Sequence, residues 1–145
     1  MFQHILVPTD GSLLSASAVD KALGFARDAG AKVTVLTAIE PFHTFSTDSK
    51  QLADTRTTYE LHSEAEAARY LAEAESKAKA LGVECNLVQV EHEHPYRAII
   101  DTATKSGCDL IAMASHGRRG VSAVIIGSET SKVLTHSSIP VLVYH

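Results

Sequence analysis

Five short apolar segments that alternate with helical patterns constrain the fold of this chain more than any other feature. The segments are rich in Val, Ile and Leu, as strands buried in a sheet require. Strands that alternate with helices indicate a parallel sheet with helices on both faces. We therefore predict an α/β fold with an open five-stranded parallel sheet. The expected strands are 2–8, 31–39, 83–91, 109–115 and 141–145.

Four helices are expected between these strands, and three of them stop at a glycine, the residue that most often ends a helix. Residues 41–56 are polar without a clear period, so we expect a loop there. The whole chain, 1–145, has the length of one domain. The expected helices are 15–30, 58–82, 96–107 (opened by His94 and Pro95) and 128–137.

Composition and charge exclude several classes of protein. The net charge is −4, so no global positive field favours nucleic acid. No apolar stretch approaches the ~20 residues that span a bilayer. The N-terminus lacks the pattern of a signal peptide. Cys85 and Cys108 have no CxxC spacing and read as free thiols, so we expect a cytoplasmic protein with no nucleic-acid or membrane partner.

The glycine-containing segment between Ala114 and Thr130 is the main candidate for a binding site. It is not a P-loop, because six residues separate Gly120 from Gly127 and no Lys follows. No G-x-G-x-x-G occurs in the chain either. Ser115 lies in MASHG, which has only half of the nucleophile-elbow pattern. A hydrolase built on Ser115 is therefore disfavoured.

The start of the last helix, at Gly127 and Ser128, supports an anion site. Unpaired backbone N–H groups and the positive end of the helix dipole attract phosphate there. Gly117 and Gly127 lack a Cβ, so a ligand could lie against the main chain, and Arg118 would add positive charge. The alternative is a tight connection that needs glycine for its dihedral angles alone. The residues leave both interpretations open.

With these residues in place, the chain resembles the universal stress proteins of the single-domain, nucleotide-binding type. That family carries G-x2-G-x9-G-[ST] at this place, where the chain has Ala114, Gly117, Gly127 and Ser128. The segments ILVPTDGS near the start and SSIPVLVYH at the end are also similar to the family. The resemblance spans the chain and is weakest from about Phe42 to Tyr59.

The resemblance implies the strand order 3-2-1-4-5 and a bound ATP or AMP, with or without Mg²⁺. Pro8, Thr9 and Asp10 would lie beside the adenosine, with Asp10 accepting a hydrogen bond, and Ala38 would line the adenine slot. The remaining contacts would be Met113 and Ala114 near the ribose, and His116, Gly117, Arg118, Gly127, Ser128, Glu129 and Thr130 near the phosphates. No catalytic residue and no protein-bound metal is expected.

Several of these positions have a second interpretation. Asp10 lies in TDGS and would also serve as a helix cap. Ala114 replaces the first glycine of the motif and does not tolerate a positive φ. Glu129 places a carboxylate near the phosphates, and we expect it to point to solvent. His116 is expected to be a loop residue of modest influence.

Other polar and aromatic residues are assigned to structure rather than to a site. His92 and His94 form an HxH without a third ligand at a suitable spacing, so we expect exposed strand-end residues. The acidic run on the second helix reads as a solvated face. Tyr59, Tyr70 and Leu71 are expected to pack.

The last strand, 141–145, predicts a homodimer, because an edge strand leaves ladder groups that a second copy can pair. The function expected is an adenine-nucleotide-binding stress-response regulator that acts as a ligand-dependent dimer. The alternative is a nucleotide-free dimeric scaffold, which Ala114 and Glu129 favour. No enzyme activity is expected, although slow ATP turnover, or phosphate transfer to Ser128, stays open.

Overall fold

Strands and helices alternate along the chain as the sequence predicts. The structure is a computed structural model that describes residues 1–42, 49–117 and 126–145. Within these ranges five strands and four helices are present. In chain order they are β1 (His4–Pro8), α1 (Leu13–Ala29), β2 (Lys32–Ile39), α2 (Ser49–Leu81), β3 (Cys85–Glu91), α3 (Pro95–Lys105), β4 (Leu110–Ala114), α4 (Ser128–His136) and β5 (Val141–Tyr144).

The strands form one sheet in the order β3-β2-β1-β4-β5, and each neighbouring pair is parallel. This confirms the predicted order. The order reverses between β1 and β4, and there the pairing is short: it covers only Ile5 with Leu110 and Leu6 with Ile111. Beyond these pairs the carboxyl ends of β1 and β4 separate. In parallel α/β sheets this position is where ligands bind.

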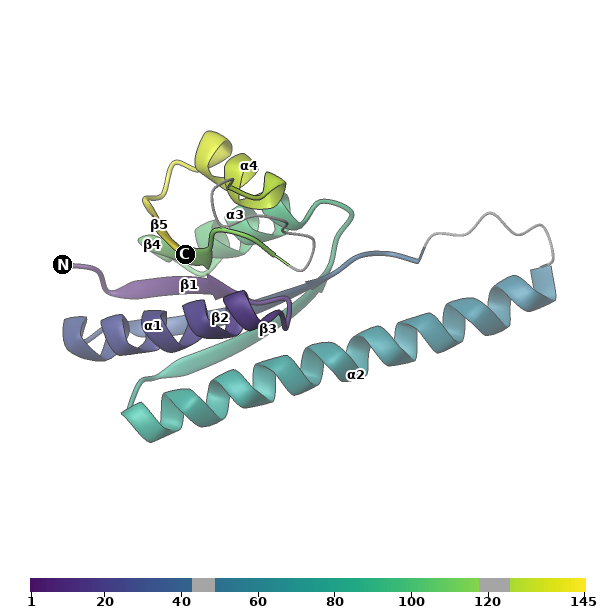
Figure 1. The fold of residues 1–145 in the computed structure, drawn as a ribbon, viewed down its shortest axis with the longest axis horizontal. Helices are drawn as coiled ribbons and strands as arrows, with labels where there is room; N and C mark the ends of the chain where they lie inside the picture. The colour runs from purple at the N-terminus through teal and green to yellow at the C-terminus, as the bar shows by residue number, and fades with distance from the viewer. Residues whose placement is uncertain (43–48, 118–125) are drawn as a thin grey trace.

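The helices cover both faces of the sheet, with α1 and α2 on one face and α3 and α4 on the other (Figure 1). Alternate residues of β1 face opposite layers, as strand geometry requires. Ile5 and Val7 belong to the core under α1 and α2. Leu6 packs instead with Ile99 and Val133 under α3 and α4. Because both faces are buried, the side chains of β1 and β4 are mainly apolar.

Helix α2 begins earlier than the sequence predicts. It covers Ser49–Leu81, so the loop expected for 41–56 is wrong from residue 49 onward, and residues 43–48 lie outside the described ranges. Residues 53–58 are exposed on every side. A helix that buries no face carries no hydrophobic period. This absence of a period explains why the sequence pattern suggested a loop.

The two cysteines do not pair and are both shielded from solvent to some degree. Cys85 is half-buried and Cys108 is buried. Burial raises the pKa of the Cys108 thiol to about 11, which keeps it protonated and unreactive at neutral pH. Within the described ranges no helix is both long enough and apolar enough to cross a membrane.

Candidate functional site

A cavity of about 510 Å³ lies at the carboxyl ends of the strands, where the strand order reverses. This volume lies in the range of small-molecule sites. The cavity brings together every predicted site residue except Arg118, which lies outside the described ranges. From the prediction, its walls contain Pro8, Thr9, Asp10, Ala38, Met113, Ala114, His116, Gly117, Gly127, Ser128, Glu129 and Thr130. Whether these residues bind a ligand stays a prediction.

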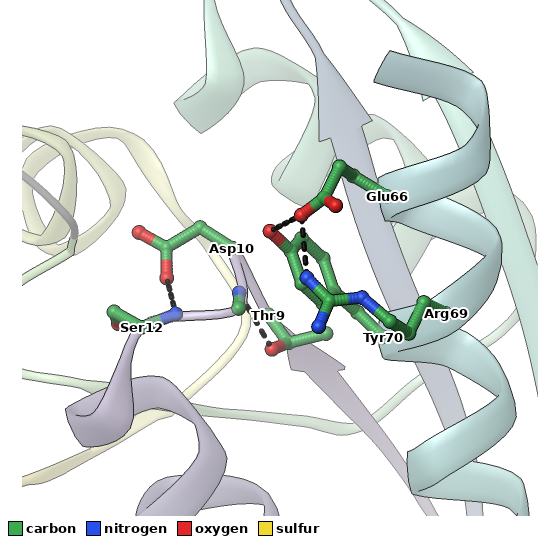
Figure 2. Close-up of polar contacts among 7 residues, drawn as sticks. Thr9, Asp10, Ser12, Glu66, Arg69 and Tyr70 are labelled. Carbon is green, nitrogen blue, oxygen red and sulfur yellow. Dashed lines mark hydrogen bonds and ion pairs between the residues drawn. The ribbon is translucent and has the colours of Figure 1, made fainter. Parts of the chain in front are cut away.

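The turn between β1 and α1 places Asp10 at the cavity. One carboxylate oxygen, Oδ1, accepts a hydrogen bond of 2.9 Å from the Ser12 N–H (Figure 2). Ser12, not Asp10, is the N-cap of α1, and its hydroxyl accepts from the Ser15 N–H. Asp10 therefore stabilises the turn before the cap, while its other oxygen, Oδ2, faces Gly117.

Thr9 contributes a wall to the cavity rather than a polar contact. Its side chain is buried, and its hydroxyl lies 3.1 Å from the Ser15 hydroxyl. The same oxygen accepts from the Gly11 N–H at 3.3 Å, and the Thr9 N–H donates to the Leu36 carbonyl at 2.8 Å. These bonds hold the end of β1 against β2 and fix the turn that carries Asp10.

Gly117 and Gly127 are required for space, not for their dihedral angles. Neither has a positive φ, so the dihedral explanation is wrong for these two positions. A Cβ on Gly117 would lie 2.7 Å from Asp10 Oδ2. A Cβ on Gly127 would lie 3.2 Å from the Ser115 carbonyl oxygen and 3.3 Å from His116 Cα. What approaches these glycines so closely is the chain itself.

The N-terminus of α4 forms one wall of the cavity. Its N-cap, Gly127, offers no side-chain hydrogen bond, and the first N–H groups of a helix have no partner within the helix. The Thr130 hydroxyl donates to the Ala114 carbonyl at 2.9 Å and is buried. Helix α4 is thereby tied to the end of β4, with its positive dipole end at the cavity.

Ala114 occupies the first glycine position of the motif without strain. It is the last residue of β4, pairs with Tyr144 and is buried. No non-glycine residue in the described ranges has a positive φ. A methyl group is therefore compatible with this backbone, and Ala114 does not by itself remove the site.

The Glu129 side chain is 39% exposed, but it does not simply point to solvent, as expected, because its carboxylate is held by two neighbours. Its Oε2 accepts a hydrogen bond of 2.9 Å from the Tyr96 N–H at the start of α3, and its Oε1 lies 3.6 Å from Lys132 Nζ. The N-cap of α3, His94, has no side-chain hydrogen bond to its helix. Glu129 supplies that cap from the neighbouring helix, and these contacts offset part of the charge that would repel a phosphate.

His116 lies in the loop after β4, as predicted, but its side chain is buried. Its exposed fraction is 7%, and its Nδ1 lies 2.9 Å from the Ser115 hydroxyl. Its Nε2 is buried and has no hydrogen-bond partner among the described residues. Ser115 is 1% exposed, so its hydroxyl is shielded from any substrate in this conformation. The backbone of Gly127 covers this pair.

One wall of the cavity was not foreseen from the sequence. A face of α2 contributes residues that we assigned to packing or to a solvated surface. Their spacing of three and four residues shows one helical face, but polar residues at this spacing do not distinguish a cavity from solvent. Leu71 alone of the expected packing residues belongs to the core. This α2 wall consists of Tyr59, His62, Ser63, Glu66, Ala67 and Tyr70.

The α2 wall is connected to the rest of the site by hydrogen bonds. The Tyr59 hydroxyl donates to the Glu40 carbonyl at 2.6 Å, which joins α2 to the segment after β2. The Tyr70 hydroxyl and the Arg69 guanidinium both donate to Glu66 Oε2 at 2.6 Å (Figure 2). These two hydrogen bonds hold the pKa of the Glu66 carboxyl below its usual value, so it is a carboxylate at neutral pH.

His92 and His94 do not form a metal site with the residues that the structure describes. The His92 Nδ1 accepts from the His94 N–H at 2.9 Å, which uses one ring nitrogen inside the turn. Over the described part of the chain, no group of three potential ligands is arranged to hold a metal ion.

The fold and the site together define a class: Rossmann-like α/β domains with a cavity at the reversal of strand order and a helix N-terminus in its wall. Comparison with known proteins narrows the class. A model of the Universal stress protein family matches residues 1–145. The chain belongs to this family, as the resemblance predicted.

Individual relatives agree with this assignment. The universal stress protein YxiE of Bacillus subtilis is 30% identical over 147 residues, which cover 99% of this chain and 99% of the relative. The universal stress protein MJ0531 of Methanocaldococcus jannaschii is 28% identical over 148 residues, covering 99% of this chain and 82% of the relative. Similarity therefore extends over the whole chain and is not confined to the glycine motif.

Solved structures share the fold. The structure of the protein MJ0577, also from M. jannaschii, is 25% identical and superposes with a TM-score of 0.80, covering 99% of this chain and 95% of the other. A universal stress protein solved in complex with cAMP is 27% identical, with a TM-score of 0.72 and coverage of 99% and 97%.

Proposed function

We propose that this universal stress protein binds an adenine nucleotide, ATP or AMP, in the cavity at the carboxyl ends of the strands. The observation that carries the proposal is the arrangement of two walls. The N-terminus of α4, which begins at Ser128 after the N-cap Gly127, supplies N–H groups suited to phosphate. Asp10 supplies a carboxylate suited to a donor on the nucleoside. Both line the same cavity of about 510 Å³.

The similar protein in complex with cAMP supports an adenine nucleotide as the ligand class, because it shares this fold over the whole chain at 27% identity. The cavity itself suits a base with a phosphorylated sugar. Leu36, Ala38 and Met113 offer apolar surface, and the N-terminus of α4 offers polar groups on one side of the cavity. The cavity therefore combines apolar surface for the base with polar groups that can fix the sugar and the phosphates.

Isothermal titration calorimetry of the full chain with AMP, ATP and ATP with Mg²⁺ tests the proposal. We expect binding of at least one of these, and Asp10→Asn to weaken it by roughly tenfold, because a hydrogen bond to a charged acceptor is lost. Asp101→Asn is the matched control, since Asp101 is exposed on α3 and does not line the cavity. No heat at millimolar nucleotide in any of the three titrations would refute the proposal.

The nucleotide-free scaffold is the second candidate, and one observation favours it. Both Gly117 and Gly127 are explained by contacts within the chain, so neither requires a ligand. The titrations above separate the two functions, because a scaffold that does not bind nucleotide would give no heat. Its unfolding temperature would also be the same with and without nucleotide.

The regulatory part of the proposal is a cytoplasmic homodimer, paired through 141–145, that responds to nucleotide. Strand β5 is at the edge of the sheet and its four residues are half-buried, which leaves an edge that a second copy can pair. We propose regulation rather than catalysis. Sedimentation equilibrium with and without AMP tests the dimer: a monomer at micromolar concentration in both conditions would refute it.

A further inference from the structure

The α2 wall contains one group whose chemistry the nucleotide proposal leaves without a role. Glu66 receives two hydrogen bonds on the same oxygen, Oε2, from Tyr70 and from Arg69. Its other oxygen, Oε1, accepts none from the residues that the structure describes. The side chain is 33% exposed and lines the cavity. A carboxylate held in this way offers a hydrogen-bond acceptor to the contents of the cavity.

The orientation of Glu66 is set by its neighbours rather than by solvent. The Tyr70 ring packs against Gly11, in the turn that also carries Asp10. The Arg69 guanidinium lies over the Tyr70 ring, 5.2 Å from its centroid. Figure 2 shows Glu66 and Tyr70 projecting from α2 beside this turn, with the Asp10 carboxylate directed away from the helix. Two carboxylates thus flank the cavity from two different elements.

The charge distribution places the nucleoside, not the phosphates, beside Glu66. A carboxylate repels phosphate oxygens, whereas the N-terminus of α4 attracts them. On this argument the phosphates would lie toward Gly127 and the base and sugar toward α2. A ligand group beside Glu66 must be a donor, since an ionised carboxylate only accepts hydrogen bonds.

We propose that Glu66 is a specificity-determining residue of this cavity, whose Oε1 accepts a hydrogen bond from an O–H or N–H of the nucleoside. The inference rests on the proposed nucleotide binding and names a residue outside the glycine motif that selects the ligand. The donor is either a ribose hydroxyl or the exocyclic amino group of adenine. Tyr70 and Arg69 act through Glu66 as positioning residues.

The experiment compares Glu66→Gln with wild type by calorimetry, using AMP, 2′-deoxy-AMP, 3′-deoxy-AMP and IMP, which lacks the amino group. We expect Glu66→Gln to weaken AMP binding about fivefold, because one hydrogen bond to a partly solvated carboxylate is lost. The wild type and the variant should bind the analogue that lacks the relevant donor with equal affinity. That analogue identifies the donor as the 2′-hydroxyl, the 3′-hydroxyl or the amino group.

Controls separate selectivity from damage to the fold. Glu73→Gln makes the same change of charge on an exposed position of the same helix and should bind AMP as the wild type does. Tyr70→Phe keeps the ring against Gly11 but removes the hydroxyl that orients Glu66, so it should reduce AMP binding less than Glu66→Gln does. Only a change that depends on the analogue marks a direct contact, because a merely structural role would weaken all four ligands by the same factor.

The outcomes distinguish the two proposals. If the wild type binds AMP and Glu66→Gln binds all four ligands as the wild type does, or weakens all four equally, the inference about Glu66 is overturned and nucleotide binding stands. If the wild type binds neither ATP nor any of the four ligands, the proposal of nucleotide binding is refuted, and the inference about Glu66 is refuted with it.

Discussion

Replacing Gly127 by alanine tests whether close packing of the chain, rather than a ligand, requires glycine in this loop. The new Cβ would lie 3.2 Å from the Ser115 carbonyl oxygen and 3.3 Å from His116 Cα. That backbone has little freedom to move away. The Ser115 N–H donates to Tyr144 at 2.7 Å and the Ser115 carbonyl accepts from Gly127 at 2.8 Å. Ser115 is thus held from both sides.

The expected magnitude follows from two opposing effects. Overpacking against fixed atoms costs ~1–3 kcal/mol, and alanine lowers the entropy of the unfolded chain, which returns ~0.4–1 kcal/mol. We expect Gly127→Ala to reduce the free energy of unfolding by about 1 kcal/mol, or roughly 3 °C in the unfolding temperature. Urea denaturation followed by circular dichroism measures this difference.

Two further glycines serve as comparisons in the same assay. A Cβ on Gly117 would meet Asp10 Oδ2 at 2.7 Å, but a carboxylate can rotate, so Gly117→Ala should cost less stability than Gly127→Ala. Gly24 is inside α1 with nothing within 4 Å of the added atom. Gly24→Ala should therefore stabilise the protein by about 0.5–1 kcal/mol. A Gly127→Ala protein as stable as the wild type would refute the argument from packing.

Two other substitutions probe the framework of the site. Thr130→Val removes the buried hydrogen bond to the Ala114 carbonyl and should lower the free energy of unfolding by about 1–2 kcal/mol. The control, Thr135→Val on the exposed face of the same helix, should change it by less than about 0.5 kcal/mol. Equal losses for the two variants in urea denaturation would contradict this. Burial, followed by the charge of Lys32, lowers the pKa of His4, so the unfolded chain binds the proton more tightly. The contribution of neutral His4 to the free energy of unfolding is therefore complete above its unfolded pKa of about 6.5 and decreases as the pH falls below that value. His4→Gln should flatten the dependence of the unfolding temperature on pH between about 7 and 5.

The fold could be predicted because each strand carries its own evidence. A strand buried on both faces is a continuous apolar run, such as residues 5–7 and 110–114, and alternation with helices leaves few topologies. The start of α2 could not be predicted in the same way. Residues 53–58 near its start bury no face, so they have helical geometry without a hydrophobic period.

The strand-end half of the site was predictable, and the α2 half was not. Gly117 and Gly127 are marked by a motif with fixed spacing, Asp10 lies in the family-like segment ILVPTDGS, and the reversal of strand order brings them together. Glu66 carries no such mark, because a carboxylate on a polar helix face reads the same beside a cavity as beside water. The Glu129 contact with Tyr96 joins residues 33 positions apart, and local patterns contain no information about such a pair.

Close contacts at three glycines connect the walls of the cavity to one another. Gly11 lies against the Tyr70 ring, Gly117 against the Asp10 carboxylate, and Gly127 against the backbone at Ser115. The turn that carries Asp10 is therefore held between α2 on one side and the end of β4 on the other. A substitution at Gly11 or Gly117 would disturb Asp10 as well as stability, so affinity for one ligand cannot separate a binding role from a packing role. Selectivity between ligands that differ by one donor can, because packing acts equally on all of them.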